Sequence, residues 1–136
     1  MSVRTARAKT LTRLGLVAGL AAAAAAVTAP TASATTAHGC EWPRVCFYLT
    51  DGDWDNGNGT PTAAFQDVTS SYQNLGSRSR GANWAYNSRN DDRVFLRYIR
   101  NSTGATESIC VNPNTVAKFT SDFTVTGIRI ETASSC

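Results

Sequence analysis

The stretch FTVTGIRIE, residues Phe123 to Glu131, alternates apolar and polar side chains. Valine and isoleucine alternate with threonine and arginine, and Gly127 interrupts the pattern. Successive side chains of a β-strand point to opposite faces, so this pattern predicts a strand with one buried face. A glycine inside such a strand suggests a bulge or a close approach of another backbone.

Similar segments precede it along the chain. They are short, rich in β-branched and aromatic residues, and separated by clusters of Asn, Asp, Gly, Ser and Pro. The predicted strands are Val45–Thr50, Thr62–Gln66, Ala82–Asn87, Arg93–Ile99, Glu107–Val111 and Phe123–Glu131. Asp67–Leu75 has apolar residues at helical spacing and is expected to form one or two helical turns at most. The pattern predicts an all-β, antiparallel sandwich or Greek-key domain.

Residues 1–34 have the organisation of a secretory signal peptide. The first 13 residues carry basic and no acidic side chains, an apolar run follows from Leu14 to Val27, and Ala32 and Ala34 form an A-x-A cleavage site. The run is shorter than the ~20 residues that span a bilayer. We expect cleavage after Ala34, secretion to the extracellular space, and a single mature domain of residues 35–136 that is not attached to a membrane.

Cleavage also changes the sign of the net charge. The chain has 13 Lys and Arg against 10 Asp and Glu, and four of the basic residues lie before Ala34, which leaves nine against ten. A domain with a net charge of −1 is not expected to bind nucleic acid. A domain of about 100 residues buries roughly 65% of the surface that its unfolded chain exposes, so one core must suffice. We also expect the protein to be a monomer.

All four cysteines lie in the expected mature domain. An even number in a small exported chain predicts two disulfides. Of the three possible pairings we favour Cys40–Cys46 and Cys110–Cys136, because the first two are close in sequence and the last residue would otherwise be untethered. Zinc is the competing interpretation, but the spacings match no common zinc site.

The stretch DGDWDNGNGT begins like a calcium loop, with Asp51, Asp53 and Asp55 at alternate positions. The glycine is one residue late, Thr62 stands where a glutamate ligand is needed, and no helix is expected on either side. We therefore expect a solvated surface loop whose Asp and Asn side chains cap the backbone, with no metal or other cofactor. Calcium binding at the three aspartates is the weaker alternative.

Residues suited to catalysis are scarce. The only histidine, His38, falls in the expected linker after the signal peptide, so a Ser-His-Asp or Cys-His arrangement would lack a base inside the domain. A pair of carboxylates could still hydrolyse a glycoside, with Asp53, Asp55, Asp91 and Asp92 as candidates. Asp91 and Asp92 are more simply explained as part of a turn, and we expect no enzymatic activity.

The middle of the chain is rich in arginine. Arginines interleaved with aromatic residues could contact an acidic polymer or a microbial envelope. The simpler interpretation is a charged strand face balanced by Asp91 and Asp92. The arginines are Arg78, Arg80, Arg89, Arg93, Arg97 and Arg100, and the aromatic residues are Trp84, Tyr86 and Tyr98.

The segment GCEWPRVCFYLTDGDW, Gly39 to Trp54, resembles the start of the small exported peptidase inhibitors related to the Streptomyces metalloproteinase inhibitor. These proteins have two cysteines a few residues apart, then an aromatic strand, then an acidic or glycine-rich turn. The segment Ala82–Tyr98 is similar to their passage into a second motif, and the likeness covers most of Gly39 to Glu131. It implies a βγ-crystallin-like sandwich of two Greek-key motifs and a metalloproteinase target.

An inhibitor of this kind needs a rigid, exposed loop that enters the proteinase cleft, because a preorganised loop loses little entropy on binding. In CEWPRVC, a Cys40–Cys46 bond would hold Trp42 on a short ring, with Pro43 restricting the backbone and Arg44 beside it. The structural alternative is a stapled hairpin end. The other candidate loops are Asp51–Pro61 and Ser77–Gly81.

The sequence thus leads to the hypothesis of a secreted, non-catalytic proteinase inhibitor whose partner is an extracellular proteinase. The alternative is a βγ-crystallin-like binding module that recognises calcium, a glycan or a microbial surface, in the manner of a killer toxin.

Overall fold

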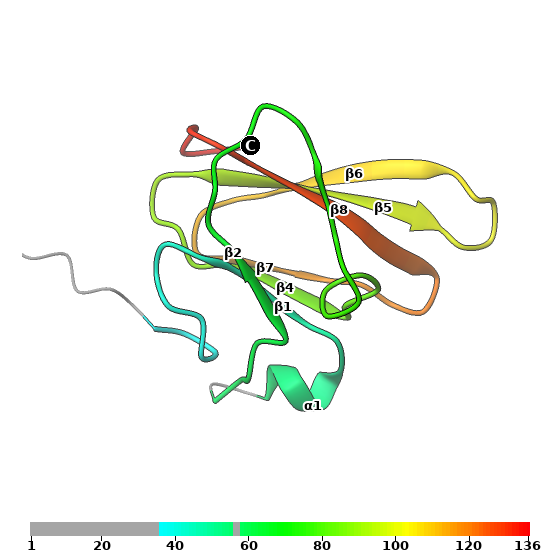
Figure 1. The fold of residues 1–136 in the computed structure, drawn as a ribbon, viewed down its shortest axis with the longest axis horizontal. Helices are drawn as coiled ribbons and strands as arrows, with labels where there is room; N and C mark the ends of the chain where they lie inside the picture. The colour runs from blue at the N-terminus through cyan, green and yellow to red at the C-terminus, as the bar shows by residue number, and fades with distance from the viewer. Residues whose placement is uncertain (1–35, 56–57) are drawn as a thin grey trace, which may run out of the picture. The chain divides into compact units, whose positions relative to one another are not determined.

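The structure, a computed structural model, describes residues 36–55 and 58–136 (Figure 1). The expected signal peptide lies outside the described residues. Among those residues, no helix is long and apolar enough to cross a membrane. The elements are β1 (Val45–Tyr48), α1 (Asp51–Trp54), β2 (Ala63–Phe65), β3 (Gln73–Asn74), β4 (Trp84–Asn87), β5 (Arg93–Arg100), β6 (Thr106–Val111), β7 (Thr115–Lys118) and β8 (Phe123–Glu131).

The strands form two antiparallel sheets, as the sequence predicted. The first sheet has the order β2-β1-β4-β7 and the second has the order β3-β8-β5-β6. Each half of the chain therefore places its third strand in the sheet of the other half. Figure 1 shows β5, β6 and β8 in one layer and β1, β2, β4 and β7 in the other. This exchange ties the two halves into one domain.

The core lies between the two sheets. Its largest members come from the central strands, and Phe47, Leu96, Ile128 and Ile130 are fully buried. Burying each such side chain stabilises the fold by about 1.5–3 kcal/mol. Leu96 and Ile128 lie opposite each other in the β5–β8 pairing, so the inward face of the second sheet is continuous.

The alternation in FTVTGIRIE is confirmed. β8 spans Phe123–Glu131, and its core-facing valine and isoleucines are fully buried. The predicted irregularity is present as well, because Arg97 pairs with Gly127 while the next residue, Tyr98, pairs with Val125. One residue of β8 is thus unpaired, which is the definition of a bulge.

Other local predictions were wrong. Asp67–Leu75 contains no helix; it holds a bridge from Val68 to Ile130 and the short strand β3, which pairs with β8. Strand β7 was missed, since its four residues acquire strand structure by pairing with β4. Short strands of this kind are set by their tertiary partner more than by their own residues.

The stretch DGDWDNGNGT was expected to be a solvated loop throughout, but its first residues form α1. Thr50 and Asp53 make a capping box: the Asp53 amide donates to Thr50 Oγ1 over 3.2 Å, and the Thr50 amide donates to Asp53 Oδ2 over 2.9 Å. Two amides that lack helical partners are satisfied in this way. Asn56 and Gly57 lie outside the described residues.

The structure joins Cys40 to Cys46 and Cys110 to Cys136, which is the favoured pairing. Each pair has its Cα atoms 5.8 Å apart. The first bond closes a small loop before β1, and the second attaches the last residue to β6.

Candidate functional site

The segment between the first two cysteines, here called the Cys40–Cys46 loop, is the first of the three candidate loops. Both cysteines are buried, and so is Val45 between them, while the side chains of Glu41, Trp42 and Arg44 are exposed. Trp42 is 43% exposed, so a large aromatic surface is available to a partner. Arg44 is exposed as well, and its guanidinium lies 3.7 Å from the Glu41 carboxylate. The Trp42–Pro43 peptide bond is cis.

Ser88, the residue after β4, holds this loop from its buried side. Its hydroxyl lies 2.7 Å from the carbonyl oxygen of Arg44 and 3.1 Å from that of Glu41, and its amide donates to the Arg44 carbonyl over 3.0 Å. Ser88 is only 1% exposed, so water competes little for these bonds. Ser88 thus holds the carbonyl that precedes Trp42 and the carbonyl of Arg44.

Arg89 fixes the carbonyl between them. Its Nη1 donates to the Pro43 carbonyl over 2.6 Å and to the Gln66 carbonyl over 3.1 Å, while its Nε donates to Asp92 over 2.6 Å. The side chains of Arg89 and Asp92 are 11% and 9% exposed. Asp92 therefore does balance one of the arginines, Arg89, but this pair is buried in the turn after β4 and does not lie on a charged strand face as predicted.

The turn that carries these residues is itself fixed by Asn87. The buried Asn87 amide donates to the carbonyl oxygens of Asp92 and Asn112, and its side-chain oxygen accepts from the Arg89 amide over 3.1 Å. The Cys40–Cys46 loop is consequently preorganised, with backbone held inside and Trp42 and Arg44 outside. Sequence reasoning found the loop but not the three residues beneath it, because they lie more than 40 positions away.

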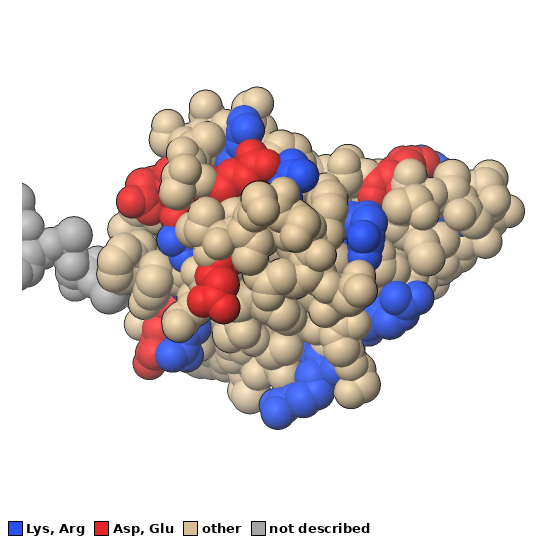
Figure 2. All heavy atoms as spheres, turned by 45° about the horizontal axis from the view of Figure 1, so that its top comes forward, with Lys and Arg blue, Asp and Glu red and all other residues tan. Residues whose placement is uncertain are grey.

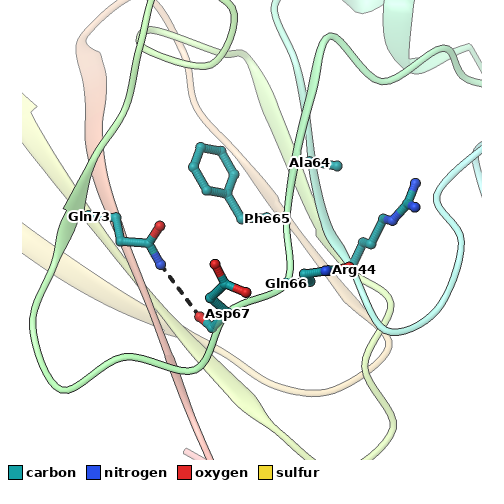
Figure 3. A pocket seen from close by; sticks show the side chains of 6 residues that line it. All are labelled: Arg44, Ala64, Phe65, Gln66, Asp67 and Gln73. Atoms are coloured by element: carbon teal, nitrogen blue, oxygen red, sulfur yellow. Dashed lines mark hydrogen bonds between the residues drawn. The ribbon is translucent and has the colours of Figure 1, made fainter.

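A hollow of about 370 Å³ adjoins the loop. Its lining comprises Arg44, Ala64, Phe65, Gln66, Asp67 and Gln73 (Figure 3). Asp67 and Gln73 lie near each other, whereas the Arg44 side chain points away from both (Figure 3). The polar groups do not converge on one point, and the lining contains a single carboxylate and no histidine.

Two of the three weak metal candidates have other partners. Asp53 caps α1, and Asp51 accepts a hydrogen bond of 2.6 Å from the indole of Trp84. Asp55 is exposed after the helix. Within residues 36–55 and 58–136 no group of three His, Cys, Asp or Glu side chains is placed to hold a metal.

Two of the four glycosidase candidates have partners too. Asp53 is occupied by the cap and Asp92 by Arg89, which leaves Asp55 and Asp91 exposed.

A residue beside one of the other two candidate loops contacts the second. Thr62, just after Asp51–Pro61, donates from its hydroxyl to the carbonyl oxygen of Arg78 over 2.7 Å. In Ser77–Gly81 the chain turns, with an Arg80 amide to Gly76 carbonyl bond of 2.7 Å and a positive φ at Gly81. These hydrogen bonds are separate from those that Ser88 and Arg89 make to the carbonyls of Glu41, Pro43 and Arg44.

An aromatic cluster on the outer face of the first sheet was not foreseen. Trp54 of α1 stacks between His38, with ring centroids 3.8 Å apart, and Trp84, with centroids 4.8 Å apart. Lys118 lies 4.3 Å from the Trp84 centroid. His38 is thus part of the folded domain, not of a linker. The sequence did contain a signal for this cluster. The run VCFY is apolar at every position, as in a strand that is covered on both faces.

The same cluster contains two buried tyrosines. Burial raises the pKa of Tyr48, and the neighbouring Tyr86 raises it further. Burial also raises the pKa of Tyr86. The Tyr48 hydroxyl donates to the carbonyl oxygen of His38 over 2.8 Å, which secures the segment before the Cys40–Cys46 loop.

Comparison of the chain with protein-family models, with curated proteins and with solved structures finds no match.

Proposed function

We propose that the domain is a secreted, non-catalytic proteinase inhibitor that presents the Cys40–Cys46 loop to its target. One observation carries the proposal: hydrogen bonds from Ser88 and Arg89 hold three backbone carbonyl groups of the loop. These are the carbonyls of Glu41, Pro43 and Arg44. A proteinase that binds this loop has little conformational freedom to remove. A cleaved loop would also stay attached through its disulfide and these bonds.

The wider assignment to a βγ-crystallin-like, two-Greek-key fold belongs to the same proposal. The exchange of third strands between the halves supports it. So does the matching order within each half, where the first strand lies between the second and the fourth, as in β2-β1-β4 and β8-β5-β6. The resemblance of Gly39–Trp54 to the metalloproteinase inhibitors suggests the class of target.

Secretion is proposed on the N-terminal sequence, and the two disulfides support it because such bonds persist in oxidising compartments. The expected cleavage after Ala34 would leave the folded segment intact, since the described structure begins at Thr36 and His38 already packs on Trp54. The partner is then an extracellular proteinase, and the inhibitor acts as a monomer.

The test is a titration of the oxidised protein against a thermolysin-type metalloproteinase and a subtilisin-type serine proteinase. We expect stoichiometric, saturable loss of one activity and an intact inhibitor after prolonged incubation. Arg44→Ala and Trp42→Ala should weaken inhibition, while Arg78→Ala, an exposed arginine in another loop, should not. Full activity of both enzymes at excess inhibitor would overturn the proposal for these two target classes.

The alternative function, a binding module, is favoured by a different observation. The outer face of the second sheet carries a row of arginines held on aromatic rings, and this surface does not involve the Cys40–Cys46 loop.

A further inference from the structure

The outer face of the second sheet forms what we call the arginine face. Its cationic members lie over two aromatic rings: Arg97 and Arg129 lie 5.2 and 5.0 Å from the Tyr72 centroid. Arg129 and Arg93 lie 4.8 and 5.1 Å from the Phe95 centroid. Contact with a ring face stabilises a guanidinium and limits its rotamers. The arginine face therefore presents its charges in fixed positions.

The strand register sets the spacing of these charges. Arg93, Phe95 and Arg97 alternate with core residues on β5, and Arg129 of β8 lies opposite Phe95. Successive levels on one face of a strand are roughly 6.6 Å apart, so the arginines form a row with that repeat. Gly127 lies opposite Arg97, and a Cβ there would come within 3.0 Å of the guanidinium. The glycine thus leaves room for Arg97 to lie flat on the sheet.

The row has an excess of positive charge. Arg93 and Arg129 share one carboxylate, that of Glu131, at 2.8 and 2.6 Å. Arg97 donates to neutral groups, the side-chain oxygens of Asn74 and Thr126. Three guanidinium groups thus face one carboxylate. Arg93 and Arg129 are 28% and 26% exposed, so an anionic group can reach them.

A hollow of about 450 Å³ adjoins the Arg93 end of the row. Hydroxyl side chains line it, together with one exposed apolar residue, Val68, and the Arg93–Glu131 pair. The hydroxyl groups are those of Thr69, Ser70 and Thr132. Hydroxyls can exchange hydrogen bonds with a sugar, and a small apolar surface can cover its CH groups.

We propose that the arginine face binds an acidic polysaccharide, with uronate carboxylates on Arg97 and Arg129 and one sugar unit in the hollow. Planar guanidinium groups suit carboxylates because two N–H groups can bind both oxygens. Both central strands, β5 and β8, are already paired on each side, so the face offers no free backbone groups to an extended peptide. Figure 2 shows basic groups separated by uncharged surface and lying beside acidic groups, which favours a local contact over a broad field for nucleic acid.

The proposal can be tested by calorimetric titration of the oxidised protein with polygalacturonate at low salt. Fully methyl-esterified polygalacturonate is the neutral control, and poly-glutamate tests an acidic peptide. We expect binding of polygalacturonate alone, weakened by added salt because the contacts are ionic. The variant Arg97→Gln/Arg129→Gln should bind about tenfold more weakly or worse, in line with the loss of two charge-assisted hydrogen-bonding groups.

The control Arg44→Gln removes a positive charge from the Cys40–Cys46 loop and should leave polysaccharide binding unchanged. Val68→Asp, at an exposed position in the hollow, should weaken binding even if the double arginine variant fails to fold. Equal binding of the esterified polymer, arginine-dependent binding of poly-glutamate at equal affinity, or no binding of polygalacturonate would each overturn the proposal. None of these outcomes bears on proteinase inhibition, which the same variants can be assayed for separately.

Discussion

The buried guanidinium of Arg89 donates a hydrogen bond of 2.6 Å to the carbonyl oxygen of Pro43, in the middle of an exposed loop. Burying a cation is unfavourable unless it is paired and its donors are satisfied, and here Asp92 and two carbonyls do both. A charged group inside the fold therefore determines the conformation of a loop on its surface.

Removal of Arg89 alone should be strongly destabilising. In Arg89→Met the Asp92 carboxylate stays buried without its partner, and we expect the free energy of unfolding to fall by roughly 3–5 kcal/mol. The double variant Arg89→Met/Asp92→Leu should recover a large part of that loss, because no unpaired charge remains. Urea unfolding measures both, and equal losses in the single and double variants would contradict this account.

Ser88→Ala separates the support of the loop from general stability. The change removes the hydroxyl bonds to the Glu41 and Arg44 carbonyls, so unfolding should become easier by about 1–3 kcal/mol and inhibition should weaken. Ser79→Ala is the matched control, since Ser79 is also 1% exposed and its hydroxyl donates to the carbonyl of Gly76, three residues away in the same turn. It should lower stability without changing inhibition. If both variants inhibit equally well, Ser88 does not preorganise the loop.

The two disulfides should differ in their effects. By the loop-entropy model, replacing Cys110 and Cys136 by alanine costs about 3.5 kcal/mol, and replacing Cys40 and Cys46 costs about 2.4 kcal/mol. Only the Cys40–Cys46 bond closes the proposed inhibitory loop. The variant without this bond should therefore lose more inhibition, although it loses less stability. Melting temperatures and inhibition constants of the two double variants test this. A loss of inhibition that simply follows stability would count against the loop.

Thr50→Ala should destabilise α1 by about 1 kcal/mol, because it removes the side chain that caps the helix. Trp54 is in α1 and stacks on Trp84, so the intrinsic fluorescence should change with it. Asp55→Ala, at the exposed residue after the helix, is the control and should leave both properties nearly unchanged.

We also expect millimolar calcium to leave the melting temperature of the unmodified protein unchanged, whereas a calcium site would raise it.

Alkaline pH should unfold the domain through its buried tyrosines. Burial raises the folded-state pKa of Tyr48 and Tyr86 above the ordinary value near 10. Below pH 10 the two tyrosines are protonated in the folded and in the unfolded state, and their contribution to the free energy of unfolding is fully present. As the pH rises above 10, the unfolded state loses protons first and stability falls. Thermal melts between pH 8 and 12 should show this decline, and Tyr86→Phe should make it shallower.

Part of the fold could be predicted because the signal is local. The alternation in Phe123–Glu131 gave the exact bounds of β8, and its glycine marked the bulge opposite Arg97. Strand β3 was mistaken for helix because Gln73 and Asn74 have no strand preference of their own and are extended only by pairing with β8. The α1 helix was missed since its Thr50–Asp53 capping box lies in a stretch that also fits a turn.

The sequence by itself predicted an all-β domain with two disulfides, because strand patterns and the number of cysteines can be read along the chain. It favoured one cysteine pairing of three and offered Trp42–Arg44 as one of several candidate loops. Only the tertiary structure decided which groups hold that segment and which form the arginine face. Ser88 and Arg89 reach the loop through the β1–β4 pairing, and Arg129 reaches Phe95 through the β5–β8 register. Such contacts depend on which strands pair and in what register, and no local pattern specifies that.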